Sequence, residues 1–133
     1  MLTRRSVLAA AAVFVFASPL AAPASSATQV GFTEAAFNAA KAAGKPILVE
    51  VSAPWCPTCK AQKPILAELA GRSKFRDLQI FEVDFDSQKD VLRALGVRQQ
   101  STLIVFKGGK EVGRSTGDTR KESIEALVTM AVN

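Results

Sequence analysis

Two apolar strands with one helical segment between them restrict the fold more than any other part of this sequence. Residues 46–53 (PILVEVSA) form an almost continuous apolar run rich in β-branched residues, which is typical of a strand buried on both faces. Residues 56–71 (CPTCKAQKPILAELAG) indicate a helix, and residues 78–86 (LQIFEVDFD) alternate like a second strand. Two strands joined by a helical crossover pair in parallel, so this region predicts an α/β fold.

The remaining segments add further helices and strands to this unit. They are expected to form two helices, a β-hairpin and a terminal amphipathic helix, over residues 31–45, 87–96, 102–117 and 118–132. The hairpin turns at its two adjacent glycines, which makes the last two strands antiparallel. The sequence therefore predicts a central mixed four-stranded sheet with helices on both faces.

The first 27 residues have the layout of a secretory signal peptide. Arg4 and Arg5 supply a basic start, and residues 7–17 form an apolar run of eleven residues. As a helix this run would cross only about half of the ~30 Å hydrocarbon core of a bilayer, so a cleaved signal is favoured over an uncleaved membrane anchor. The stretch TRRSVL also loosely resembles a twin-arginine signal, so the export route, Sec or Tat, is left open.

Small residues at and before Ala24 and Ala27 fit the specificity of a signal peptidase. We therefore expect cleavage after one of these alanines, one domain over residues 28–133, and a periplasmic or secreted protein. This domain carries 15 basic and 12 acidic residues and no histidine. The small, scattered excess of positive charge gives no reason to expect a nucleic-acid partner.

Cys56 and Cys59 are the only cysteines, and they form a C-x-x-C motif at the expected start of a helix. A structural disulfide there would close a loop of four residues and would stabilise the fold by only about 2 kcal/mol. A zinc site needs four ligands, usually cysteine and histidine, and the chain has two cysteines and no histidine. A redox pair is therefore favoured over both alternatives, and such a pair needs no bound metal or cofactor.

The position of the motif also distinguishes the two sulfurs. Residues three apart on a helix share one face, and their Cα atoms, about 5 Å apart, lie within disulfide range. The first cysteine lies at the positive end of the helix dipole, where the thiolate is favoured. We therefore expect Cys56 to attack and leave, and Cys59, one turn deeper and shielded, to resolve the mixed disulfide.

Residues 47–70 (ILVEVSAPWCPTCKAQKPILAELA) resemble the active-site strand and helix of the thioredoxin superfamily. The agreement includes Trp55 before the first cysteine, the C-x-x-C motif, Lys60 after it, and Pro64 five residues past the second cysteine. The final hairpin also resembles that of the family, and the leading helix and strand look most like the C-terminal thioredoxin-like domain of the membrane disulfide reductase DsbD. The resemblance implies a thioredoxin-like fold and a thiol–disulfide oxidoreductase that acts on proteins or peptides.

Two acidic residues depart from the family pattern. Glu50 stands where thioredoxins have a buried aspartate that accepts or relays the proton of the resolving thiol, so the resemblance implies that role for Glu50. A charge inside an apolar strand also needs an explanation, and the alternative is a carboxylate that reaches a strand end or solvent. Glu82 stands where the family usually has a lysine, and its alternation with apolar neighbours supports a solvent-facing side chain at least as well as a second buried acid.

The expected substrate-binding residues are Trp55, Pro57, Thr58 and Ser101. Trp55 lies in the loop before the motif and can shape a protein-binding surface, with a position in the core as the alternative. Pro57-Thr58 replaces the Gly-Pro dipeptide of the family, which changes the redox potential. Ser101 occupies the position of a cis proline, so this loop is either trans and reshaped or strained. Proline at position 101 is expected to raise general disulfide-reductase activity.

These features favour an exported thiol–disulfide oxidoreductase that is recycled by a membrane or soluble redox partner, such as a membrane reductant of the DsbD type. The direction of electron flow is left open. Ser101 also suggests two alternatives. One is a thioredoxin-fold binding module with little exchange activity. The other is a carrier of metal or iron–sulfur clusters, since the proline of the family is thought to keep metals off the sulfurs.

Overall fold

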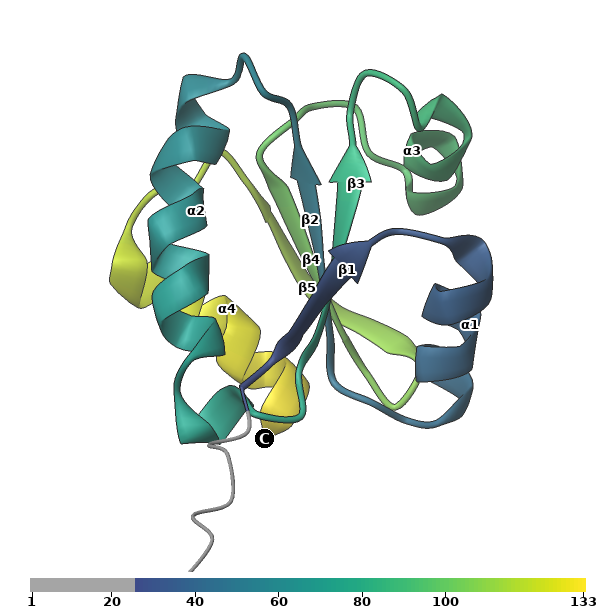
Figure 1. Cartoon of the computed structure of the whole chain (residues 1–133), viewed down its shortest axis with the longest axis vertical. Helices are drawn as coiled ribbons and strands as arrows, with labels where there is room; N and C mark the ends of the chain where they lie inside the picture. Colours follow the sequence, from purple (N-terminus) through teal and green to yellow (C-terminus); the bar gives the residue numbers. More distant parts are fainter. Residues whose placement is uncertain (1–25) are drawn as a thin grey trace, which may run out of the picture.

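The computed structural model describes residues 26–133, and the signal peptide expected at residues 1–27 lies outside them except for its last two residues. The described elements, in chain order, are β1 (Thr28–Gly31), α1 (Glu34–Ala42), β2 (Ile47–Ser52), α2 (Pro57–Ala70), the short 3₁₀ helix η1 (Ser73–Phe75), β3 (Gln79–Asp84), α3 (Lys89–Leu95), β4 (Thr102–Lys107), β5 (Lys110–Thr116) and α4 (Lys121–Val132) (Figure 1). A short connection between β2 and α2 carries the first cysteine.

The described strands form one mixed sheet in the order β1-β3-β2-β4-β5. β3 pairs in parallel with β1 and β2, whereas β4 runs antiparallel to β2 and β5 runs antiparallel to β4. The predicted α/β class and mixed sheet are confirmed, but the sheet has five strands rather than the four expected. The additional strand, β1, reads TQVG and is exposed along its whole length, so it lacks the apolar pattern from which the other strands were predicted.

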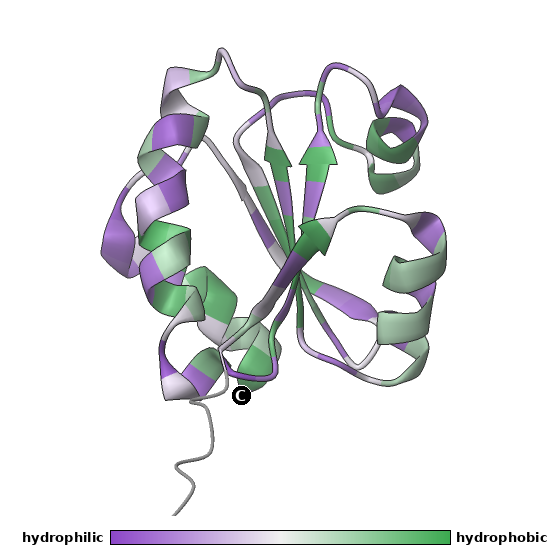
Figure 2. Cartoon of the chain, in the orientation of Figure 1, coloured by the Kyte–Doolittle hydropathy of each residue, from purple (hydrophilic) through white to green (hydrophobic). Residues whose placement is uncertain are grey.

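The side chains of β2 divide between two hydrophobic cores, because successive residues of a strand point to opposite faces. Ile47, Val49 and Val51 lie in a core with α1 and α3, and Leu48 lies in a core with α2 and α4. Figure 1 shows these two pairs of helices on opposite sides of the sheet, and Figure 2 shows hydrophobic residues concentrated on the central strands between them. Glu50 lies on the same face of the sheet as Leu48 and therefore faces α2.

Local signals in the sequence agree with the observed ends of several elements. Thr33 caps α1 by accepting a hydrogen bond from the Ala36 N–H at 3.2 Å. Gly108 and Gly109 both have a positive φ, 57° and 79°, as a two-residue hairpin turn requires.

Within residues 26–133, no helix is both long enough and apolar enough to cross a membrane.

Candidate active site around Cys56 and Cys59

The two cysteines lie where the chain leaves β2 and begins α2. Cys56 is the N-cap of α2, and Pro57 takes the first helical position, where its missing N–H breaks no helical hydrogen bond. The Cys56 Sγ accepts a hydrogen bond from the Cys59 N–H at 3.2 Å, so this sulfur takes the place of a capping oxygen. Both cysteines are free thiols, and each is only 1% exposed.

A serine hydroxyl lies within hydrogen-bond distance of both sulfurs. The Ser101 Oγ is 3.1 Å from the Cys56 Sγ and 3.2 Å from the Cys59 Sγ, and all three side chains are buried. Ser101 directly precedes β4, and the antiparallel register pairs Thr102 with Val51, near the end of β2 that leads to the motif. The sheet therefore brings Ser101 to Cys56 across a sequence separation of 45 residues.

The backbone of Ser101 has a conformation that proline cannot adopt. Within residues 26–133 no peptide bond is cis, and the φ angle of Ser101 is 61°, in the left-handed region. Proline fixes φ at about −65° and has no N–H, whereas the Ser101 N–H donates a hydrogen bond to the Val51 carbonyl at 2.8 Å. The premise that proline would fit this position is therefore wrong, and Ser101→Pro is expected to distort the loop instead.

The contacts around the sulfurs shift the two thiols in opposite directions. Burial alone would raise the pKa of Cys56, but hydrogen bonds from the Cys59 side chain, the Ser101 hydroxyl and nearby backbone N–H groups bring that pKa below its ordinary value. Burial raises the pKa of Cys59, and the hydrogen bond between the two thiols raises it further. This asymmetry supports the predicted roles, with Cys56 as the attacking thiolate and Cys59 as the thiol that keeps its proton.

Cys59 is shielded from solvent, as its place one turn into the helix predicts, but Cys56 is shielded to the same extent, since each residue is 1% exposed. The surface beside them is formed by Trp55, which is 55% exposed, by exposed Pro57 and by half-buried Thr58. The Trp55 Nε1–H donates a hydrogen bond to the Asp86 carboxylate at 2.9 Å. This bond holds the indole at the surface, so Trp55 does not occupy the core.

Glu50 is buried on the sheet face that α2 covers, with 1% of its surface exposed. Its carboxylate lies 3.5 Å from the Lys63 ammonium, and the same ammonium lies 3.2 Å from the Glu82 carboxylate. Burial raises the pKa of Glu50, the Lys63 ammonium opposes this effect, and the Glu82 carboxylate adds to it. Glu82 itself is only half-buried, in agreement with the solvent-facing interpretation.

Glu50 has no direct bond to the dithiol. Within the described residues, the hydrogen-bond partner of the Glu50 carboxylate is Lys63, and no hydrogen bond joins this carboxylate to either sulfur. Lys63 follows Cys59 by four residues on α2, so these two side chains share one face of the helix. The acid therefore lies beneath the helical turn that follows Cys59, and proton transfer between Glu50 and Cys59 needs an intermediate carrier such as water.

Two residues of α2 beside the site received no role in the sequence analysis. Lys63 supplies the cation for Glu50, and no local pattern distinguishes it from any other exposed helical lysine. Gln62 is 0% exposed. The other buried residues of α2 are Cys59, Leu66 and Leu69. A polar residue within this buried stripe is the signal that could have identified Gln62.

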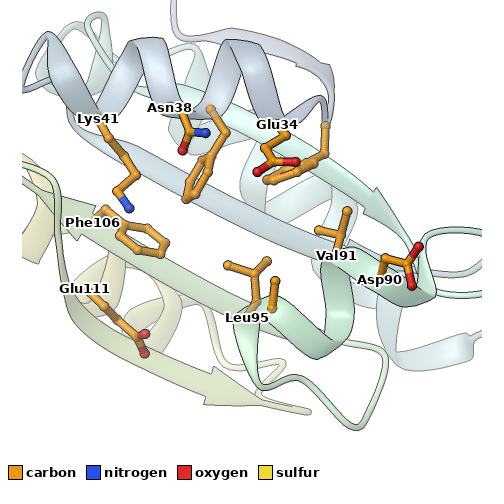
Figure 3. A pocket seen from close by; sticks show the side chains of 11 residues that line it. Glu34, Asn38, Lys41, Asp90, Val91, Leu95, Phe106 and Glu111 are labelled. Atoms are coloured by element: carbon orange, nitrogen blue, oxygen red, sulfur yellow. The ribbon is translucent and has the colours of Figure 1, made fainter.

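A separate cavity of about 400 Å³ lies between α1 and α3 (Figure 3). Its lining includes three phenylalanines, and the Lys41 ammonium lies 5.3 Å from the ring centroid of Phe37. None of the expected site residues lines this cavity.

Across residues 26–133, no three His, Cys, Asp or Glu side chains gather in a group that could hold a metal ion. The dithiol is therefore the chemically active centre that the described residues support best.

Comparison with known proteins gives the same family throughout. The thioredoxin family model matches residues 28–130. Thioredoxin H2-1 of Oryza sativa subsp. japonica is 34% identical over 94 residues, which cover 71% of this chain and 67% of the rice protein. The thioredoxin of Chlamydia muridarum (strain MoPn / Nigg) is 37% identical over 83 residues, which cover 62% of this chain and 79% of that protein.

Solved structures agree with these sequence matches. The crystal structure of Trxlp from Edwardsiella tarda EIB202 superimposes with a TM-score of 0.75 at 43% sequence identity, and the match covers 77% of this chain and 99% of Trxlp. The two relatives matched by sequence are thioredoxins. The finer resemblance to the C-terminal domain of DsbD therefore stays a prediction.

Ser101→Gly is expected to raise the pKa of Cys56. The change removes the hydroxyl that favours the thiolate and keeps a residue that readily adopts a φ of 61°. For each unit by which that pKa exceeds the assay pH, the thiolate fraction falls about 10-fold and intrinsic nucleophilicity rises about 3-fold, so attack slows about 3-fold. Ultraviolet absorbance of the thiolate, followed against pH, measures the shift.

Ser115→Ala is the matched control for this experiment, because the Ser115 hydroxyl is also buried but has no hydrogen-bond partner within the described residues. The control should leave the titration of Cys56 unchanged. If Ser101→Gly also leaves it unchanged, the Ser101 hydroxyl does not stabilise the thiolate.

Glu50→Gln is expected to slow disulfide exchange near neutral pH and to stabilise the fold. Exchange slows because Cys59 loses the group expected to accept its proton.

The effect on stability follows from the raised pKa of Glu50. Since this pKa lies above 4.5, the folded state binds the Glu50 proton more tightly than the unfolded chain does. The contribution of Glu50 to the free energy of unfolding therefore falls as the pH rises from the ordinary value through the folded-state pKa. Each pKa unit corresponds to about 1.4 kcal/mol, and the glutamine variant avoids this loss.

Rates of exchange and denaturant unfolding, each measured against pH, test the two effects of Glu50→Gln separately. Glu82→Gln is the control, because it removes a half-buried carboxylate that contacts the same lysine. We expect this control to change both quantities much less than Glu50→Gln does. A pH–rate profile of Glu50→Gln that matches the unmodified protein would leave Glu50 with a structural role alone.

Proposed function

This chain belongs to the thioredoxin family of thiol–disulfide oxidoreductases, and we propose that it is exported and exchanges disulfides with protein or peptide substrates. The observation that carries the proposed exchange is the geometry of the pair, in which Cys56 caps α2 and accepts from the Cys59 N–H, together with the opposite pKa shifts of the two thiols. A sulfur with a lowered pKa at a helix N-terminus is an effective nucleophile and leaving group. A neighbouring thiol that keeps its proton stays available for the second step.

The exchange begins at Cys56. Its thiolate attacks one sulfur of the substrate disulfide, the S–S bond of the substrate breaks, and the departing sulfur leaves as a thiolate that takes up a proton. Cys59 then loses its proton, with Glu50 as the proposed acceptor through an intermediate carrier, and attacks the Cys56 sulfur. The second substrate sulfur leaves and a Cys56–Cys59 disulfide forms, so two electrons have passed from the protein to the substrate.

Substrate contact is proposed for the residues at the mouth of the site. Trp55, Pro57 and Thr58 present surface beside Cys56. Because Cys56 is only 1% exposed, attack requires the surrounding loops to open locally. Ser101 contributes its hydroxyl from the opposite loop. We propose that this hydroxyl is released from the Cys56 sulfur when the mixed disulfide forms.

The reaction is reversible, and the reduction potential of the Cys56–Cys59 couple sets its direction. A potential of about −270 mV would resemble that of a thioredoxin, and one of about −120 mV would resemble that of a periplasmic oxidant. A partner must return the pair to its starting state after each cycle. The sequence resemblance to DsbD leads us to propose a membrane reductant of that type, with a soluble reductase as the alternative.

Export is proposed from the layout of the first 27 residues. Strand β1 begins at Thr28, and the Ala27 N–H donates to the Ala70 carbonyl at 2.9 Å, so cleavage after Ala24 would keep a contact that cleavage after Ala27 would remove. In an oxidising compartment the two cysteines would pair unless a partner reduced them.

The two alternative functions can be separated from exchange by simple assays. The paired thiols with opposite pKa shifts favour exchange over a binding module. Reduction of insulin no faster than by the buffer dithiol alone would support the binding module. Visible absorbance of the purified protein would support a carrier of iron–sulfur clusters.

Cys59→Ser should accumulate mixed disulfides with substrate proteins, because Cys56 can still attack but nothing resolves the product. Cys56→Ser is the matched control and should trap far fewer partners. Non-reducing electrophoresis of the two variants, expressed with the intact leader, measures the difference. Equal trapping by both variants would contradict the assigned roles.

The exported protein should begin near Ser25 or Thr28. N-terminal sequencing of protein from the periplasm of a bacterial host measures this, and intact Met1 on soluble cytoplasmic protein would contradict export. Changing Arg4 and Arg5 together to lysine should stop export by the Tat route and leave the Sec route unaffected.

A further inference from the structure

The carboxamide of Gln62 is a buried polar group that the mechanism above does not use. Gln62 lies on α2, three residues after Cys59, and is fully buried. Its Nε2 donates hydrogen bonds to two backbone carbonyls, that of Ser101 at 3.2 Å and that of Asp118 at 2.9 Å. Its Oε1 is buried and has no hydrogen-bond partner within residues 26–133.

The two carbonyl partners fix the orientation of the Gln62 side chain. Carbonyl oxygens only accept hydrogen bonds, so the NH₂ group must face them and the Oε1 must point away. A buried acceptor without a partner is unfavourable, and an apolar side chain of the same length would avoid that loss. The two hydrogen bonds that the NH₂ group donates to backbone carbonyls offset this cost by holding those carbonyls in place.

The group that Gln62 holds is the peptide carbonyl of Ser101. This residue has a φ of 61°, a conformation that is unfavourable for a residue with a Cβ atom. Three hydrogen bonds to its backbone keep it there: its N–H donates to the Val51 carbonyl at 2.8 Å, and its carbonyl accepts from the Gly117 N–H at 3.0 Å and from Gln62. Of these backbone bonds, the one from Gln62 alone comes from α2, the helix that carries Cys59 and is capped by Cys56.

We infer that Gln62 is a positioning residue, which ties the Ser101 loop to the cysteine helix and so keeps the Ser101 hydroxyl within hydrogen-bond distance of both sulfurs. Without this tie, α2 and the loop can separate, and the hydroxyl no longer follows the thiols. This inference rests on the proposed exchange through the dithiol, but its test requires no substrate protein.

Gln62→Met is the variant that tests this inference, because methionine has a similar length and no N–H donor. We expect the thiolate titration of Cys56 to move to higher pH, in the direction expected for Ser101→Gly. The thiolate form of the reduced Cys56–Cys59 pair is then less stabilised. The equilibrium of this pair with glutathione should therefore move at least threefold toward the Cys56–Cys59 disulfide. This change corresponds to a reduction potential about 14 mV more reducing. The variant should stay folded, since it loses two hydrogen bonds but also removes the unpartnered Oε1. Gln62→Leu serves as a second variant if the methionine variant does not fold.

A double variant separates positioning from a general structural effect. With Ser101→Gly already present there is no hydroxyl to position, so adding Gln62→Met should cause no further shift in the titration or in the potential. Gln88→Met is the matched control. It removes one hydrogen bond to the Phe32 carbonyl and one from the Asp84 N–H, neither of which involves Ser101. It should lower the melting temperature and leave the thiolate titration unchanged.

Two results would overturn the inference. One is a Gln62→Met titration that matches the unmodified protein, and the other is a shift of equal size with and without the Ser101 hydroxyl. A different result would overturn the proposed function and leave this inference intact. In that case Gln62→Met shifts the Cys56 titration to higher pH as expected, but the unmodified protein does not reduce insulin.

Discussion

The burial of β2 is the constraint on which the site depends. Because every residue of this strand is buried, helices must cover both faces of the sheet, and the chain must leave the carboxyl end of β2 before it can begin α2. That short connection brings the Cys56 sulfur to the free N–H groups of a new helix. The antiparallel pairing of β2 with β4 brings Ser101 to the same end of the sheet. The strand order thus assembles a dithiol and a hydroxyl from distant parts of the chain.

Burial and hydrogen bonding have opposing effects at the sulfurs. Burial disfavours a thiolate, and Cys59 shows the result, because its pKa is raised. Cys56 has the same exposed fraction, yet its pKa is lowered, because the Cys59 thiol and the backbone N–H groups of Thr58 and Cys59 donate to it, in addition to the Ser101 hydroxyl that lies near both sulfurs. Water has little access to Cys56, a residue that is 1% exposed, so the protein must supply the hydrogen-bond donors. This need gives a physical reason for a serine at position 101, since the family's proline at that place could offer the thiolate neither a hydroxyl nor an N–H.

The sequence predicts those features that depend on local patterns. The helix-start position of Cys56 follows from its spacing to Cys59 and from the proline after it, and the buried strands follow from continuous apolar runs. Strand β1 has no such pattern, because it is short and exposed and is held by pairing with β3. The contact of Ser101 with the sulfurs was suggested only by a family resemblance, since it depends on the register between β2 and β4. The backbone conformation of Ser101 and the role of Gln62 depend on tertiary hydrogen bonds, so no local pattern specifies them.

The cation that partly compensates the buried Glu50 carboxylate comes from the cysteine helix. The family usually has a lysine at the position of Glu82, and in this chain the nearest cation to Glu50 comes instead from Lys63 on the cysteine helix. One ammonium therefore faces two carboxylates, which leaves Glu50 only partly compensated and agrees with its raised pKa. Because Lys63 and Cys59 share one face of α2, a movement of this helix that changes the distance from Lys63 to Glu50 also changes the proton affinity of the acid. Protonation of Glu50 and the position of the cysteine helix are thus thermodynamically linked.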